Sequence, residues 1–149
     1  MIRKASAVWK GSLKEGKGTI STESGALSNT PYSFATRFED ARGTNPEELI
    51  AAAHAGCFTM ALSAQLGNAG IKPESLETTA SLTMEKLEAG FTITKIHLDV
   101  TARIPSADSY SAAFEKAAQD AKAGCPISRL LKAEITMSAQ IVGEQAKSA

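Results

Sequence analysis

The sequence predicts an α+β fold in which antiparallel sheets pack with a small number of helices. Two observations support this class: segments with strand-like alternation lie on both sides of one long apolar helix, and neighbouring strand segments are joined by turn-forming residues typical of hairpins. A third is the expected element order, β-β-β-α-β-β-α-β, which lacks the repeated βαβ unit of a doubly wound parallel sheet. A length of 149 residues suits one domain, so we expect residues 1–149 to form a single domain.

The N-terminal part of the chain predicts a three-stranded antiparallel unit. Residues 2–10 place two alanines and Trp9 on one side of a strand, and the glycine-rich turn GSLKEGKGT leads into a second strand at residues 19–22. Residues 32–39 alternate between an aromatic-rich set and a second set of side chains, so we expect them to form the third strand. The aromatic-rich set is Tyr32, Phe34, Thr36 and Phe38.

The clearest helix signals occur between residues 45 and 70. Asn45 is a favourable N-cap, Pro46 suits the first helical position, Glu48 completes a capping box, and Gly67 or Gly70 marks the exit. The body of this helix is small and apolar on almost every side, which predicts a buried helix whose alanines and glycines let another helix backbone approach closely. A chain this short has little protein with which to cover such a helix, so we expect help from a second subunit.

The chain after this helix predicts a long hairpin, because residues 76–85 and 91–104 alternate on either side of the turn Glu88-Ala89-Gly90. An amphipathic helix is expected from Asp108 to Lys122, with its aromatic and alanine residues on the inner side. Those inner residues are Tyr110, Phe114, Ala117 and Ala118.

The last part of the chain begins where Gly124 ends the amphipathic helix. Cys125-Pro126 then opens a short helical turn, because proline is well tolerated at the first helical position. Residues 133–142 are expected to form the final strand.

Charge and composition exclude several functions. Lysine plus arginine and aspartate plus glutamate number 16 each, so there is no basic excess to attract nucleic acid. No apolar run of signal-peptide length follows the N-terminus, and no stretch of about 18 uninterrupted apolar residues occurs, so we expect a soluble, cytoplasmic protein without a membrane partner. The two cysteines and two histidines lack the C-x-x-C or H-x-x-x-H spacing of a local zinc site, and we expect no metal.

Cys57 lies about three turns into the long helix, in the sequence HAGCF. Free cysteine is often buried, so one interpretation is an inert core thiol. The other is a nucleophile, which must react as the thiolate. An apolar helix interior raises the pKa of a thiol, and the helix dipole fades beyond the first turn, so a reactive Cys57 needs a cation from elsewhere in the fold.

The candidates for this cation include His54 and Arg37. His54 stands three residues before Cys57 and shares its helix face, but it is equally compatible with a core or interface histidine whose hydrogen bond is satisfied. Arg37 ends the third predicted strand just before the turn into the helix, and it fits either a reach back over the helix or a solvated strand end. The residues by themselves leave these alternatives open.

Glu48 also has two interpretations. The capping box with Asn45 accounts for it structurally, whereas a bidentate pair with an arginine would make it functional. Nine residues at about 100° each place Glu48 and Cys57 about half a turn apart around the helix and roughly 13 Å apart along it. We therefore expect either that the helix bends near residues 51–53 or that Glu48 serves the cysteine of another subunit.

Cys125 lies at an expected helix N-terminus, where free backbone N–H groups favour a thiolate. This position suits an accessible, exchange-competent thiol, although a simple loop cysteine fits equally well. A helix thiol and a second thiol at a helix start match a peroxidatic and resolving pair, because a sulfenic acid formed at one can condense with the other. Their separation along the chain leaves open whether Cys57 and Cys125 meet.

Four ordered motifs resemble the OsmC/Ohr family over nearly the whole chain, and the OsmC branch most closely. They are GKGTISTESG, YSFATRFED, GTNPEELIAAAHAGCF and AKAGCPIS, the last followed by a strand. The resemblance implies an intertwined α+β homodimer in which antiparallel sheets flank two buried central helices and the active sites lie at the subunit interface.

The same resemblance implies roles for individual residues. Cys57 corresponds to the peroxidatic cysteine and Cys125 to the resolving cysteine. Arg37 corresponds to a catalytic arginine that supplies the missing cation and binds the peroxide oxygens, and Glu48 to the glutamate that holds this arginine.

The implied activity is the reduction of organic hydroperoxides to alcohols, in defence against oxidative or osmotic stress. Cys57 becomes a sulfenic acid, Cys125 converts it to a disulfide, and an external dithiol, for example of the lipoyl type, reopens that bond. An apolar wall formed by Phe38, Phe58 and Met60 would favour organic over inorganic peroxides. No organic cofactor is expected, because the two sulfurs store the redox equivalents.

Two other functions compete with this interpretation. A non-catalytic carrier would use the same apolar interface to hold a hydrophobic ligand, with both thiols structural, and would keep its function in a Cys57→Ser variant. A general thiol–disulfide oxidoreductase is disfavoured because C-x-x-C is absent.

Overall fold

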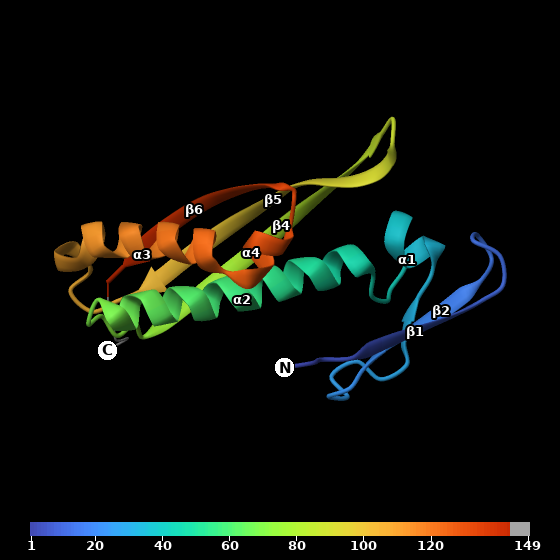
Figure 1. The fold of residues 1–149 in the computed structure, drawn as a ribbon, viewed down its shortest axis with the longest axis horizontal. Helices are drawn as coiled ribbons and strands as arrows, with labels where there is room; N and C mark the ends of the chain where they lie inside the picture. Colours follow the sequence, from blue (N-terminus) through green and yellow to red (C-terminus); the bar gives the residue numbers. More distant parts are fainter. Residues whose placement is uncertain (144–149) are drawn as a thin grey trace, which may run out of the picture. The chain divides into compact units, whose positions relative to one another are not determined.

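The computed structural model divides the chain into two compact units, Met1–Ile50 and Ala51–Ala149, and describes residues 1–143. Each unit holds one three-stranded sheet, and the helices that accompany the sheets confirm the α+β class (Figure 1). The prediction of a single domain stays a prediction.

The first unit is built on the strands β1 (Ala5–Lys10), β2 (Lys17–Thr22) and β3 (Thr30–Tyr32), which form an antiparallel sheet in that order. The predicted three-stranded antiparallel arrangement is therefore confirmed, but its third strand is Thr30–Tyr32 instead of residues 32–39. Gly18 pairs with Trp9 on one side and Tyr32 on the other, and those two rings lie 5.4 Å apart between centroids. A Cβ at Gly18 would lie 2.4 Å from the Tyr32 ring, so only glycine lets the two rings close over the strand.

The segment after β3 differs from the sequence prediction, because Phe34–Phe38 forms the short helix α1 instead of continuing a strand. Ser33 caps this helix: its hydroxyl accepts from the backbone N–H of Thr36, while the Thr36 hydroxyl accepts from the backbone N–H of Ser33. Such local side-chain to backbone bonds compete with strand pairing, which is why an alternating pattern is misleading here.

Helix α2 (Pro46–Asn68) begins and ends as predicted. Asn45 Oδ1 accepts from the backbone N–H of Glu48 at 2.8 Å, and Gly70 has the positive φ of +73° that follows the last turn. Within this chain only one stripe of the helix is buried, so the expectation of burial on almost every side is not met by one subunit alone. The buried stripe consists of His54, Phe58, Leu62 and Leu66.

The length and apolar composition of α2 would also allow it to cross a membrane. Core helices of water-soluble proteins share these two properties, and four side chains of α2 are packed into the protein core, so length and composition alone are weak evidence for a membrane span.

The second unit contains the predicted hairpin, β4 (Ser75–Leu87) and β5 (Gly90–Arg103), joined by a tight turn. The expectation of purely antiparallel sheets is wrong here, because β6 (Glu134–Val142) pairs with β5 in parallel. The connection between β5 and β6 passes through helices, so the chain returns to the same end of the sheet before β6 starts. The result is one mixed sheet with a single crossover.

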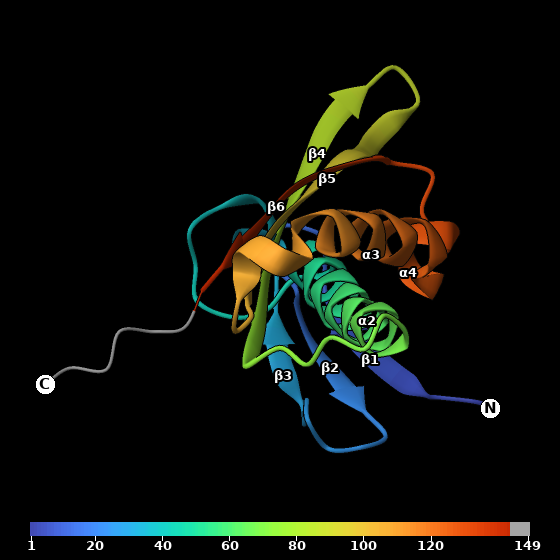
Figure 2. The same cartoon turned by 90° about the vertical axis from the view of Figure 1, so that its left-hand side faces the viewer.

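The crossover contains a 3₁₀ turn (Ala107–Tyr110), then α3 (Ser111–Gly124) and α4 (Pro126–Leu130). Figure 2 shows α2 and α3 side by side against one face of the β4-β5-β6 sheet. The core lies between these layers, and α3 turns its predicted inner side toward it. Core residues include Phe58, Leu62, Ile96, Leu98, Val100, Phe114, Ala117, Ala118 and Ala121.

Candidate active site

The second unit brings the two cysteines together, which the sequence left open. Cys57 comes from the middle of α2 and Cys125 from the junction between α3 and α4, and their Sγ atoms lie 2.7 Å apart. Both cysteines are free thiols. Since the sulfurs of a disulfide lie about 2.05 Å apart, oxidation of this pair to a disulfide needs little movement.

The exposures of the two thiols are the reverse of those expected. Cys125 is 0% exposed, whereas Cys57 is half-buried. Cys125 is held by the backbone on both sides, because its N–H donates to the carbonyl of Ala121 and its carbonyl accepts from the N–H of Arg129. One residue thus ends α3 and starts α4, and this packed junction hides a side chain that the sequence predicts to be accessible.

Burial raises the pKa of the Cys57 thiol, and the neighbouring Cys125 thiol raises it further. The backbone N–H of Ile127, in the first turn of α4, donates to Cys57 and lowers the pKa against these two effects. The prediction that burial raises the pKa of the Cys57 thiol is confirmed. The sequence predicts that the start of α4 provides donors for Cys125, but the structure directs one of them to Cys57 instead.

A second contact between α2 and α4 lies next to the thiol pair. His54 Nε2 and Ser128 Oγ are 2.8 Å apart, and both residues are buried. His54 Nδ1 has no hydrogen-bond partner among the described residues, and burial lowers the pKa of the imidazole, which favours its neutral form. The structure thus favours the interpretation of His54 as a core histidine with one satisfied nitrogen. Ser128 was not identified from the sequence, because a serine in a short helix carries no pattern of its own.

Arg37 in the first unit forms a bidentate ion pair, but its partner is Glu47 instead of the predicted Glu48. Arg37 Nε donates to Glu47 Oε1 at 2.9 Å and to Oε2 at 3.2 Å, and the terminal nitrogen Nη2 donates to Oε1 at 2.6 Å. Glu48 is exposed and its backbone N–H is held by the Asn45 cap. Adjacent helical residues point about 100° apart, so only one of two neighbouring glutamates can face a given arginine, and the sequence does not say which.

Arg37 and Phe38 line an apolar pocket of about 220 Å³ within the first unit. The arginine lies over the Phe38 ring, with its guanidinium carbon 5.3 Å from the ring centroid. Five further residues line this pocket, and none of them was named as a site residue from the sequence. They are Trp9, Leu13, Tyr32, Ser33 and Phe34.

The other two predicted wall residues have opposite environments. Phe58 is 0% exposed and belongs to the core of the second unit, and its predicted contact with a peroxide stays a prediction. Its position four residues from both His54 and Leu62 places it on the buried stripe of α2. Met60 is 78% exposed in this chain and stays a predicted contact.

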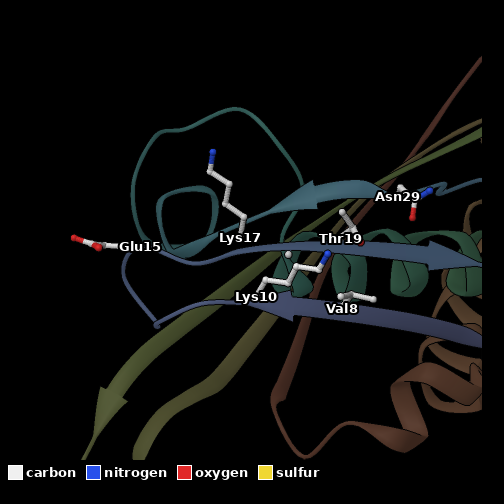
Figure 3. A pocket seen from close by; sticks show the side chains of 7 residues that line it. Val8, Lys10, Glu15, Lys17, Thr19 and Asn29 are labelled. Carbon is white, nitrogen blue, oxygen red and sulfur yellow. The ribbon is translucent and has the colours of Figure 1, made fainter.

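A larger hollow lies on the first sheet and is lined by polar and charged groups as well as Val8 (Figure 3). Its charged residues are Lys10, Glu15 and Lys17, and it contains no thiol or imidazole. It therefore offers no group for redox chemistry. Among residues 1–143, no three histidine, cysteine, aspartate or glutamate side chains are grouped closely enough to hold a metal ion.

The family is shown by a model described as OsmC-like protein, which matches residues 39–140 of the chain. The chain belongs to the OsmC-like family. This OsmC-like chain is 55% identical to Peroxiredoxin OsmC of Escherichia coli K12 over 139 residues, covering 93% of the chain and 96% of the relative. It is 29% identical to Organic hydroperoxide resistance protein-like 1 of Staphylococcus epidermidis, covering 68% of the chain and 71% of that relative. The resemblance described from the motifs is confirmed.

Solved structures show the same fold at lower identity. The OsmC-like chain matches an OsmC-like protein from Mycoplasma pneumoniae with a TM-score of 0.73 and 15% identity, covering 95% of the chain and 98% of that structure. It matches the organic hydroperoxide resistance protein OhrB of Bacillus subtilis with a TM-score of 0.64 and 23% identity, covering 93% and 98%. These likenesses establish the OsmC/Ohr fold for this chain.

Proposed function

We propose that this OsmC-like chain is a thiol-dependent peroxidase that reduces organic hydroperoxides to alcohols. Two groups of relatives support a peroxidase-type activity, one named peroxiredoxin and the other named for resistance to organic hydroperoxides. The observation that carries the proposal is the distance of 2.7 Å between the Sγ atoms of Cys57 and Cys125. Two free thiols this close can supply two electrons to an oxidant by forming a disulfide.

The proposed cycle starts with the Cys57 thiolate, which attacks the terminal oxygen of the hydroperoxide. The O–O bond breaks, the alkoxide takes a proton and leaves as the alcohol, and Cys57 becomes a sulfenic acid. The Cys125 sulfur then attacks the Cys57 sulfur, which forms the disulfide and releases the hydroxyl group with the Cys125 proton as water. An external dithiol, of which the lipoyl type is one example, reduces the disulfide and is itself oxidised to a disulfide.

Cys57 is the attacking thiol in this proposal because it has the greater access to solvent. Cys125 is fully buried and thus suited to react only with a group that is already inside the protein, namely the oxidised Cys57. The Ile127 N–H that donates to Cys57 would stabilise the thiolate that attacks.

Arg37 is proposed to supply the positive charge that the Cys57 thiolate needs and to bind the peroxide oxygens. Its support in this chain is the bidentate pair with Glu47, which fixes the guanidinium plane, together with the apolar pocket that it lines. An apolar pocket next to a cation suits a hydroperoxide with an organic substituent. The catalytic role assigned to Glu48 stays a prediction from the motif.

The proposal includes an intertwined homodimer in the cytoplasm. Much of the apolar α2 surface is uncovered in one chain, and a second copy would cover it. A reducing compartment would keep the two cysteines as thiols between cycles. Protection against oxidative or osmotic stress is the corresponding physiological role.

The deciding experiment mixes anaerobically reduced protein with one equivalent of cumene hydroperoxide and measures free thiols and intact mass. The wild type should lose two thiols and two mass units, as expected when two thiols form one disulfide. Cys57→Ser should consume no hydroperoxide, and Cys125→Ser should consume it but stop at a sulfenic or over-oxidised Cys57. If the wild-type protein keeps both thiols and leaves the hydroperoxide intact, the peroxidase proposal is wrong, and a carrier that uses the apolar pocket beside Arg37 becomes the better explanation.

A further inference from the structure

Two side-chain pairs join α2 to the α4 segment, and the pairs are separated by the same number of residues on both. Cys57 meets Cys125 in one pair, and His54 meets Ser128 in the other. His54 and Cys57 are three positions apart on α2, which corresponds to about 4.5 Å along an ideal helix and places them on one face. Ser128 likewise follows Cys125, the N-cap of α4, by three positions. The two pairs run in opposite chain directions, so α4 runs antiparallel to α2, with the thiol pair beside the hydrogen-bonded pair. Figures 1 and 2 show α4 lying against α2.

We propose that the His54–Ser128 hydrogen bond is a latch that holds α4, and with it Cys125, against Cys57. His54 and Ser128 are then positioning residues for the disulfide-forming step, and neither is assigned contact with the substrate. This inference deepens the proposed function and rests on it where the peroxide reaction is concerned. The closure of the disulfide itself can be measured without any peroxide.

Helix α4 needs such a latch because it has little stability of its own. It contains five residues, which is far below the length at which an isolated helix persists in water. At its two ends the N–H of Arg129 donates to the carbonyl of Cys125 and the N–H of Leu131 donates to the carbonyl of Ile127, and Leu130 is 74% exposed. Contacts with α2 must therefore contribute to holding it in place.

The other polar contacts between the two helices involve the reacting sulfur. Both the Cys125 thiol and the Ile127 N–H are bonded to Cys57 Sγ, so both contacts change when that sulfur gains an oxygen atom. The bond from His54 to Ser128 involves neither sulfur and can persist through the oxidation. It is thus suited to keep Cys125 close during the interval in which Cys57 is a sulfenic acid.

The buried, unpaired nitrogen of His54 indicates that this side chain does more than fill space in the core. The side chain is 0% exposed and its Nδ1 lacks a partner among the described residues, an arrangement that costs stability which an apolar side chain would avoid. Burial lowers the pKa of the imidazole and keeps it in the neutral form, so its bond to the Ser128 hydroxyl does not depend on charge near neutral pH.

The disulfide-forming step that the latch assists needs only the two cysteines of the protein. The Cys57 sulfenic acid and the Cys125 thiol give the disulfide and one water molecule, with no further oxidant. If Cys125 is displaced, a second hydroperoxide molecule can instead oxidise the sulfenic acid to a sulfinic acid and leave as the alcohol. The latch therefore decides between these two products.

The test compares Ser128→Ala with two control variants of the full-length protein. Ser128→Thr keeps a hydroxyl at the latch. Thr78→Val removes a hydroxyl that accepts from Thr59 at 2.8 Å and joins α2 to β4, so it loses a comparable hydrogen bond away from α4. Alanine has a higher helix propensity than serine, so Ser128→Ala is expected to fold, and circular dichroism checks this.

The first measurement is the equilibrium between the dithiol and the Cys57–Cys125 disulfide in mixtures of reduced and oxidised dithiothreitol. Ser128→Ala should lower the equilibrium constant for disulfide formation about fivefold, the effect expected from losing one neutral hydrogen bond, while both controls stay near the wild type. His54→Phe should give the same loss, and the double variant should lose no more than either single one, because both remove the same bond. Equal constants for Ser128→Ala and Thr78→Val would overturn the latch.

The second measurement uses excess cumene hydroperoxide and intact mass. Ser128→Ala should convert several times more protein to the sulfinic form, which is about 32 mass units heavier because of its two added oxygen atoms, than the wild type or Thr78→Val does. An unchanged ratio of sulfinic acid to disulfide would contradict the latch. If the wild type consumes no hydroperoxide while the dithiothreitol equilibrium still depends on Ser128, the peroxidase proposal fails and the latch stands.

Discussion

Cys57 and Cys125 form one proposed redox pair, and their different surroundings suit them to different steps. Cys57 has partial access to solvent and receives the Ile127 N–H, whereas Cys125 is buried between two helices. Burial also raises the pKa of Cys57, so a cation must be provided for the thiolate to exist at neutral pH. Arg37, fixed by Glu47, is the proposed source of that charge.

The pH dependence of Cys57 tests the role of Arg37. Removing a positive charge near a thiolate raises the pKa of the thiol, so Arg37→Met should move the rate profile for alkylation of Cys57 by iodoacetamide to higher pH. A thiol pKa that is higher by about one pH unit lowers the alkylation rate near pH 7 about tenfold. The pH profile of Arg37→Lys should lie between those of the wild type and Arg37→Met. The control is Arg42→Met, which changes an exposed arginine and should leave the profile unchanged. An unchanged profile in Arg37→Met would show that Arg37 does not act on Cys57.

The choice between Glu47 and Glu48 can be made by comparing two isosteric variants. Glu47→Gln weakens the bidentate pair and should lower kcat/KM for cumene hydroperoxide about tenfold, because the guanidinium loses its charged partner. Glu48→Gln should have a much smaller effect, since this exposed side chain is not paired with Arg37 in the chain. The opposite ranking would return the role to Glu48, as the motif implies.

At the scale of secondary structure, short helices position the reactive groups. Helix α1 carries Arg37 in its last turn, and α4 carries the donor to Cys57 and the serine of the latch. Helices of five residues depend on caps and neighbours more than on their own backbone bonds. Local hydrogen bonds therefore matter more for this site than the long strands do.

The cap of α1 predicts a measurable loss of stability. Ser33→Ala removes the hydroxyl that accepts from the Thr36 N–H and should lower the free energy of unfolding by about 1 kcal/mol, measured by urea denaturation. Ser28→Ala, at an exposed position outside helices and strands, is the matched control and should change little. A loss of the same size in both variants would mean that the cap contributes nothing beyond a generic serine.

At the scale of the whole molecule, one chain leaves apolar surface on α2 without cover. Only one stripe of the helix is buried, and Met60 stands 78% exposed three residues after Cys57. Exposed apolar surface of this kind is typical of a protein–protein interface, as in the proposed homodimer.

The proposed dimer predicts the behaviour of a variant at Met60. Met60→Lys places a charge on the uncovered face of α2 and should shift the protein from dimer toward monomer, as measured by light scattering coupled to size-exclusion chromatography. Lys116→Met is a control on the exposed side of α3 and should leave the mass unchanged. A monomeric wild type, or a Met60→Lys protein as dimeric as the wild type, would contradict this interface.

The sequence by itself determined the features that depend on local chemistry and period. Asn45 and Pro46 start α2, alternation and a glycine turn make the β4–β5 hairpin, and the ordered motifs around the cysteines identify the family. These signals can be recognised from the sequence alone because each depends on residues within a few positions of one another.

Only the tertiary structure decided which distant groups meet. It brought Cys125 to Cys57, paired Arg37 with Glu47 instead of its neighbour, joined His54 to Ser128, and turned β6 parallel to β5. These outcomes depend on how helices rotate and where a crossover returns the chain, and a rotation of about 100° exchanges one glutamate for the next. The physical reason is that local patterns define an element and its apolar face, whereas packing of the completed elements selects the polar atoms that come within bonding distance.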